Sequence, residues 1–162
     1  YTKTADGRPM KEAPSREELL AEFYDPHHFQ LERWVKDALV EAESCLIVDC
    51  HSFPSKPLPC DLDQALDRPD ACIGTDPFHT PATLIERAAN AVREAGWSLE
   101  IDRPYAGTIV PTSHYRRDPR VQSIMIEVNR RLYMNEATGA KSDGFDPTHR
   151  TISLVLQTLA AS

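Results

Sequence analysis

Two short, almost uninterrupted apolar runs constrain the fold of this chain more than any other feature. The first covers residues 45–50 (CLIVDC) and the second covers residues 121–128 (VQSIMIEV). Strands with one solvated face alternate apolar and polar residues, whereas near-continuous apolar runs of this length are typical of strands buried on both faces of an α/β sheet. We therefore predict that both runs are buried strands with helices packed against their sheet.

Segments with a helical period lie around the two runs. Apolar residues recur at spacings of three and four over residues 31–42, 84–95 and 152–159, which predicts amphipathic helices there. Helix-start signals precede them, and Gly96 is placed to end the second helix. These signals are Ser15 with Glu18 in a capping box, Asp25-Pro26, Thr80 as a capping hydroxyl before Pro81, and Asp146-Pro147.

The remaining segments complete the expected architecture. Residues 97–102 are predicted to form a strand, and the proline-rich stretch 51–81 is predicted to be a long loop of functional importance. Residues 1–14 are polar and aperiodic, which indicates a surface segment. Because helices and strands alternate along the chain, we expect a single α/β layered domain.

Composition narrows the function classes. The chain has 162 residues, of which 41% are hydrophobic, and a net charge of −7, so it can build one core and has no overall field that attracts nucleic acid or anionic membrane. It contains no apolar run long enough to span a bilayer, and we expect a cytoplasmic protein. None of the four cysteines forms a Cys-x-x-Cys pair, and Cys45 and Cys50 are expected to be inert buried thiols.

Two polar residues stand out because they lie at the predicted strands. His51 directly follows the first apolar run. Ligands of open α/β sheets bind beyond the C-terminal ends of the strands, and imidazole is the commonest zinc ligand. A capped loop histidine is the alternative. Glu127 lies inside the second run, where a carboxylate must be paired, bound to a metal or raised in pKa, and a raised pKa suits a general base. Its alternative is a salt bridge to Arg130 or Arg131, or exposure to solvent.

Two arginine-containing segments are candidates for binding an anion. Arg103 to Gly107 and Asn129 to Arg131 could clamp a carboxylate, although a solvated basic patch is the alternative. The His-Glu-x-x-His, Gly-x-Ser-x-Gly and phosphate-loop motifs do not occur, which argues against the corresponding protease, serine hydrolase and kinase classes.

Four segments of the chain resemble the N-formylglutamate amidohydrolase family, in the family's order and over nearly the whole chain. They are LIVDCHSF (46–53), ACIGTDPFHT (71–80), RPYAGTIVP (103–111) and SIMIEVNRRLYM (123–134), and YDPHH (24–28) is similar to the family segment before the histidine-bearing strand.

The resemblance implies a three-layer α/β/α fold with a mixed, zinc-exopeptidase-like sheet of the phosphorylase/hydrolase type. It also implies zinc-dependent hydrolysis of N-formyl-L-glutamate to formate and glutamate, a step of histidine degradation, with a small anionic N-acyl amino acid as the ligand. By this resemblance His51 is a zinc ligand and Glu127 is the general base. Arg103, Tyr105, Arg130 and Arg131 are then candidates to hold the substrate carboxylates.

One departure from the family pattern concerns the metal. The family's further zinc ligands come from a segment that we expect upstream of Tyr1, because a catalytic zinc needs about three protein ligands and only His51 matches one. The alternatives are a related deacylase or peptidase acting on another N-acyl amino acid, and a non-catalytic module of the same fold. The sequence leaves the oligomeric state open.

Overall fold

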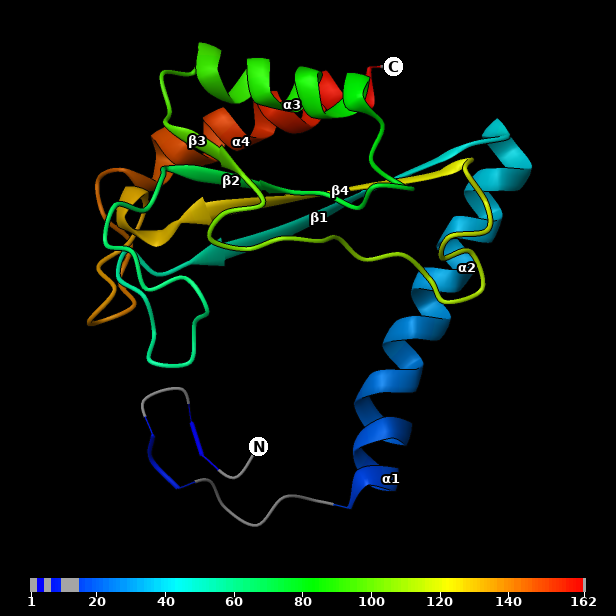
Figure 1. The fold of residues 1–162 in the computed structure, drawn as a ribbon, viewed down its shortest axis with the longest axis horizontal. Coiled ribbons are helices and arrows are strands. Elements are labelled where there is room, and N and C mark those ends of the chain that lie inside the picture. Colours follow the sequence, from blue (N-terminus) through cyan, green and yellow to red (C-terminus); the bar gives the residue numbers. More distant parts are fainter. Residues whose placement is uncertain (1–2, 5–6, 10–14, 162) are drawn as a thin grey trace.

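A four-stranded mixed sheet forms the centre of the molecule (Figure 1). The computed structural model describes residues 3–4, 7–9 and 15–161. The strands β1 (Cys45–Phe53), β2 (Ala71–Gly74), β3 (Leu99–Ile101) and β4 (Val121–Asn129) are arranged in the order β1-β4-β2-β3. β1 runs parallel to β4 and β2 runs parallel to β3, whereas β2 and β4 are antiparallel. The predicted α/β fold with a mixed sheet is confirmed.

Two helices cover one face of the sheet. α3 (Ala82–Glu94) and α4 (Phe145–Ala160) pack on each other and on the sheet, and Figure 1 shows both above the strands. Burial of their apolar stripes provides the main hydrophobic stabilisation, since each fully buried aliphatic side chain contributes about 1.5–3 kcal/mol. The buried cluster comprises Ala71, Ile73, Leu84, Ala88, Ala89, Val92, Ile124, Ile126, Val155 and Leu159.

The opposite face of the sheet is lined by long connections instead of by these helices. The connection between β3 and β4 crosses it, and the Ser123 hydroxyl donates to the Ile109 carbonyl over 2.7 Å. On the same face the buried Cys72 thiol donates to the Tyr105 carbonyl over 3.1 Å. The sheet therefore has a helical face and a face on which backbone and polar side chains meet.

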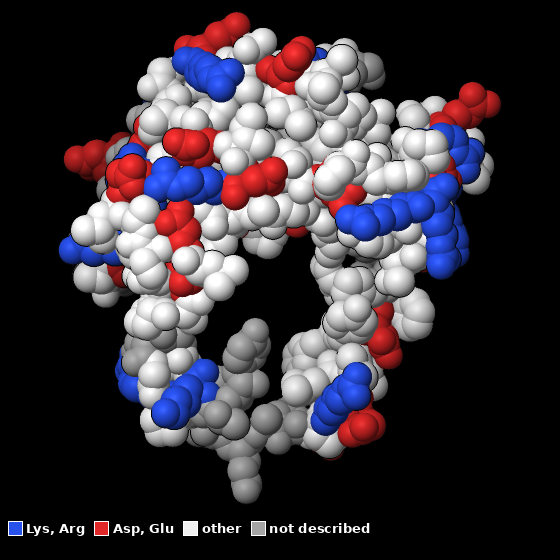
Figure 2. Space-filling view, viewed as in Figure 1, with Lys and Arg blue, Asp and Glu red and all other residues white. Residues whose placement is uncertain are grey.

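The N-terminal helices extend away from the sheet. α1 (Arg16–Leu19) begins with the predicted Ser15–Glu18 capping box, continues through one π-helical turn at Leu20–Tyr24 and runs into α2 (Asp25–Ala42). Only Val35 of the predicted α2 stripe is buried, and Trp34 is 63% exposed. The helix forms as its period predicts, but its main contact with the sheet is at β1, and Figure 2 shows an opening between it and the body of the molecule.

Two local predictions need correction. The stretch 51–81 is not one loop, because β1 continues to Phe53 along its pairing with β4 and because β2 lies within it. Thr80 does not cap α3: Pro81 holds the cap position, and the Thr80 hydroxyl donates to the Ser123 carbonyl at 2.6 Å. The predicted surface segment 1–14 lies mostly outside the described residues. In the described part of the chain, no helix is long and apolar enough to cross a membrane.

Replacement of Gly74 by alanine is expected to destabilise the fold. A Cβ at the end of β2 would overlap the Gly107 carbonyl oxygen and the Met125 methyl group, so the backbone of the crossing connection would have to move. Overpacking of this kind costs about 1–3 kcal/mol. Urea denaturation should show a lower midpoint with an unchanged m value. An unchanged midpoint would mean that the connection tolerates the methyl group.

Candidate active site

His51 and Glu127 lie side by side on the two central parallel strands. Residues 45–53 of β1 pair in register with 121–129 of β4, and this register places His51 opposite Glu127. On the other side of β4, Cys72 is in register with the same glutamate. Residues in register on neighbouring strands share a face of the sheet, so the three side chains form a row on the face away from α3 and α4.

Glu127 is a buried carboxylate with one oxygen lacking a partner. The residue is 7% exposed, and its Oε2 atom is buried without a hydrogen bond among the described residues. Burial raises the pKa of its carboxyl group, and electrostatic interactions with His51 and Arg130 offset this rise only in part. The alternative reading of Glu127, a salt bridge to Arg130 or Arg131, is not seen among the described residues. A carboxyl of raised pKa with a free oxygen has the properties of a proton-transfer group.

Asp49 orients the His51 imidazole. The two residues are two positions apart on β1 and therefore on the same face, and the Nε2 atom of His51 lies 2.8 Å from Oδ1 of Asp49. The imidazole is half exposed. A carboxylate on one ring nitrogen fixes the tautomer and leaves the other nitrogen available to a ligand.

Arg130 lies beyond the end of β4 and lines a pocket with Cys50, His51 and Ser52. Its Nε donates to the Ser52 hydroxyl at 3.2 Å, and its Nη2 donates to the Ser52 carbonyl at 3.1 Å. No carboxylate among the described residues pairs with it. The guanidinium is thus anchored to β1 next to His51 and keeps unused donors for an anionic ligand.

The other predicted anion-binding residues have partners within the protein. Arg131 donates to Asp70 at 2.7 Å and to the Arg68 carbonyl at 3.1 Å. Arg103 donates to Asp63 and to Asp67, each at 2.9 Å. These two guanidinium groups hold loops in place, whereas that of Arg130 does not pair with a carboxylate.

Tyr105 belongs to a buried network that the sequence did not indicate. Its hydroxyl donates to Asp61 at 3.1 Å, and the same Asp61 oxygen accepts from Arg68 at 2.8 Å. The side chains of Arg68 and Asp61 are 1% and 8% exposed. Burial by itself would raise the pKa of the Asp61 carboxyl, but hydrogen bonds from the Leu58 amide, Arg68 and Tyr105 lower it overall. This network fixes the 54–70 segment beside the row of site residues.

The other histidines do not supply an obvious second ligand. His79 is fully buried, with Nδ1 2.7 Å from the Val121 carbonyl and Nε2 accepting from the Arg116 amide at 2.8 Å, so both nitrogens are used. Within the described residues, no group of three or more His, Cys, Asp and Glu side chains is arranged to hold a metal ion. Burial also raises the pKa of the Cys72 thiol to about 11, which makes it a poor ligand.

Solved structures share this fold. The crystal structure of N-formylglutamate amidohydrolase from Ralstonia eutropha JMP134 superposes with a TM-score of 0.73 and 26% identity, over 90% of this chain and 53% of that one. The gene product Atu2144 from Agrobacterium tumefaciens gives a TM-score of 0.65 and 14% identity, over 99% of this chain and 62% of that one. The chain therefore spans about half of the first structure and somewhat more of the second. No curated protein sequence matches it.

The family model for N-formylglutamate amidohydrolase matches residues 1–134, which include β1, β4 and all of the site residues described above. The match covers most of the chain and agrees with the similarity in fold. The chain belongs to the N-formylglutamate amidohydrolase family.

Proposed function

We propose that the protein containing this chain hydrolyses N-formyl-L-glutamate to formate and L-glutamate in a zinc-dependent reaction of histidine degradation. The observation that carries the proposal is the pairing of His51 with Glu127 on adjacent strands, where Glu127 has a buried oxygen without a partner. Family membership provides the substrate class.

The residues present fit one ligand position of a zinc site. His51 would hold the metal through the ring nitrogen that Asp49 does not contact, as in carboxylate–histidine–zinc arrangements. Bound zinc polarises an acyl oxygen and lowers the pKa of water. We expect further ligands to come from outside the described residues, since a single imidazole binds zinc weakly.

Glu127 would transfer the proton in this reaction. At neutral pH the carboxylate would accept a proton from the attacking water, and its raised pKa makes it a stronger base for that step; the carboxyl group formed would then donate the proton to the leaving amine. Its burial within β4 restricts its position, so the catalytic oxygen is oriented before the substrate binds.

Arg130 is the residue placed to bind a substrate carboxylate. N-Formylglutamate carries two carboxylates, whereas Arg103 and Arg131 are already paired with aspartates. This observation supports a second candidate, an N-acyl amino acid with a single carboxylate that one guanidinium anchors.

Two measurements test these candidates. The first compares the hydrolysis of N-formylglutamate with that of N-formyl and N-acetyl derivatives of glutamate, leucine and alanine by the full-length protein. Preference for N-formylglutamate supports the first candidate, and equal or better use of the monocarboxylates supports the second. The second measurement is elemental analysis of the same protein. Absence of both zinc and hydrolysis under every metal supply would argue for a non-catalytic module.

Replacement of Asp49 by asparagine is expected to weaken zinc binding by about 10–100-fold, the usual effect of losing a carboxylate that orients a histidine ligand. The neutral amide cannot stabilise the same imidazole tautomer as strongly. Competition with a fluorescent chelator measures the zinc affinity of the full-length protein. Asp37→Asn, on the exposed surface of α2, is the matched control and should bind like the wild type. Equal affinities for the two variants would remove Asp49 from the site.

A further inference from the structure

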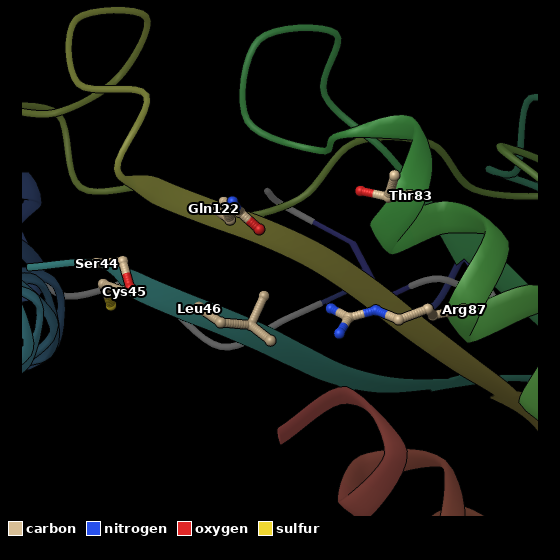
Figure 3. Close-up of a pocket in the computed structure, with 6 residues that line it drawn as sticks. All are labelled: Ser44, Cys45, Leu46, Thr83, Arg87 and Gln122. Atoms are coloured by element: carbon tan, nitrogen blue, oxygen red, sulfur yellow. The ribbon is translucent and has the colours of Figure 1, made fainter. Parts of the chain in front are cut away.

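A pocket lies at the opposite end of the central strands from Glu127. It has a volume of about 410 Å³, and Figure 3 shows its lining from α3, β4 and the start of β1. The lining residues are Ser44, Cys45, Leu46, Thr83, Arg87 and Gln122. Gln122 and Glu127 are five residues apart on β4, which corresponds to about 16 Å along a strand. The pocket is therefore separate from the proposed active site.

Arg87 has no counter-charge in this pocket. Figure 3 shows its side chain reaching from α3 over the strands towards Leu46 of β1. Its Nε atom is buried without a hydrogen-bond partner, and its side chain forms no ion pair or hydrogen bond with any residue that the structure describes. Three other arginines, Arg68, Arg103 and Arg131, each form an ion pair with an aspartate. A buried, unsatisfied N–H of a cation costs free energy that an anionic partner would recover.

The remaining polar groups of the pocket suit an anion. Thr83 lies one helical turn before Arg87 on α3, and Gln122 and Ser44 reach the pocket from β4 and from the residue before β1. Their hydroxyl and amide groups donate hydrogen bonds, and none of the six lining residues is acidic. A planar guanidinium in a pocket whose other polar groups are neutral can bind carboxylate or phosphate oxygens in bidentate fashion.

We propose that this pocket is a binding site for a small oxyanion, with Arg87 as its principal ligand and Thr83 and Gln122 as supporting donors. The shared chemistry is a carboxylate or phosphate group. The site is independent of the proposed hydrolysis, because none of its lining residues belongs to the row formed by His51, Glu127 and Cys72.

Calorimetric titration of the purified protein tests the proposal, with inorganic phosphate and with acetate at constant ionic strength. Saturable binding of only one of the two anions identifies whether the site prefers phosphate or carboxylate. Binding of both means that the site does not distinguish a phosphate from a carboxylate group. Arg87→Met should weaken this binding at least about tenfold, as expected from losing one charge-assisted hydrogen bond. Arg87→Lys keeps the positive charge but loses the planar guanidinium that binds an anion through two hydrogen bonds. Its anion affinity should therefore lie between those of the wild type and Arg87→Met.

Arg93→Met is the matched control, because Arg93 is an exposed arginine in the last turn of the same helix. It removes the same charge and should bind the anions like the wild type. Thermal unfolding of each variant separates loss of the site from loss of the fold. Two results would overturn the proposal: no saturable binding of either anion by the wild type, or equal weakening by Arg87→Met and Arg93→Met.

Discussion

Replacement of Glu127 by glutamine is expected to lower the turnover number for N-formylglutamate by about 10²–10⁴-fold, the usual contribution of general acid–base catalysis. The amide preserves the volume and the position on β4 but neither accepts nor releases the proton. The initial rate of formate release by the full-length protein measures the effect. Zinc content should stay unchanged, because Glu127 is not proposed as a ligand.

Two controls distinguish a catalytic from a structural role for Glu127. Glu100→Gln, at an exposed glutamate of β3, should keep the wild-type rate. Because burial raises the pKa of Glu127 in the folded state, ionisation costs stability as the pH rises above the usual glutamate range. The Glu127→Gln variant should therefore melt at or above the wild-type temperature at pH 7, and this difference should vanish in acid. A slow enzyme with a lowered melting temperature would instead indicate damage to the fold.

Replacement of Arg68 by methionine is expected to destabilise the protein by about 3–5 kcal/mol, because it leaves the Asp61 carboxylate buried without its counter-charge. For a chain of this length the melting temperature should fall by on the order of 10 °C. Calorimetry or circular dichroism measures the shift. Since the pKa of Asp61 is lowered overall in the fold, the deficit should shrink as the pH falls and Asp61 becomes protonated.

A matched pair of variants tests the same interaction. Arg120→Met removes an arginine whose side chain is 58% exposed in its ion pair with Asp118, and it should lower the melting temperature much less than Arg68→Met does. Adding Asp61→Asn to Arg68→Met should restore part of the lost stability, because the uncompensated charge is then removed. If Arg68→Met and Arg120→Met cost the same, the network around Tyr105 does not hold the 54–70 segment.

Local sequence patterns correctly predicted the helices and strands whose formation depends on neighbouring residues. The apolar runs at 45–50 and 121–128 became β1 and β4, and the helical periods became α2, α3 and α4. The capping box at Ser15 formed because both of its hydrogen bonds join residues three positions apart. β2 was missed since four residues, ACIG, within a proline-rich stretch carry too little pattern to stand out.

The chemistry-bearing residues of the site could be named from the sequence, but their environment could not. His51 and Glu127 were chosen from their positions after and within apolar runs, yet only strand pairing places them in register. Arg103, Tyr105, Arg130 and Arg131 looked equivalent as anion binders, whereas the fold pairs Arg103 and Arg131 with aspartates and keeps Arg130 available.

Burial and charge pairing also depended on the tertiary structure and could not be predicted from the sequence. Sequence periodicity correctly gave α2 an apolar stripe, but the tertiary structure directs the helix away from the sheet and buries only Val35. The Arg68–Asp61 pair and the unpaired Arg87 are likewise decided by which side chains the folded backbone brings within hydrogen-bonding distance. Local sequence determines backbone conformation through short-range forces, whereas pKa shifts, ion pairs and pockets depend on contacts between residues far apart in the chain.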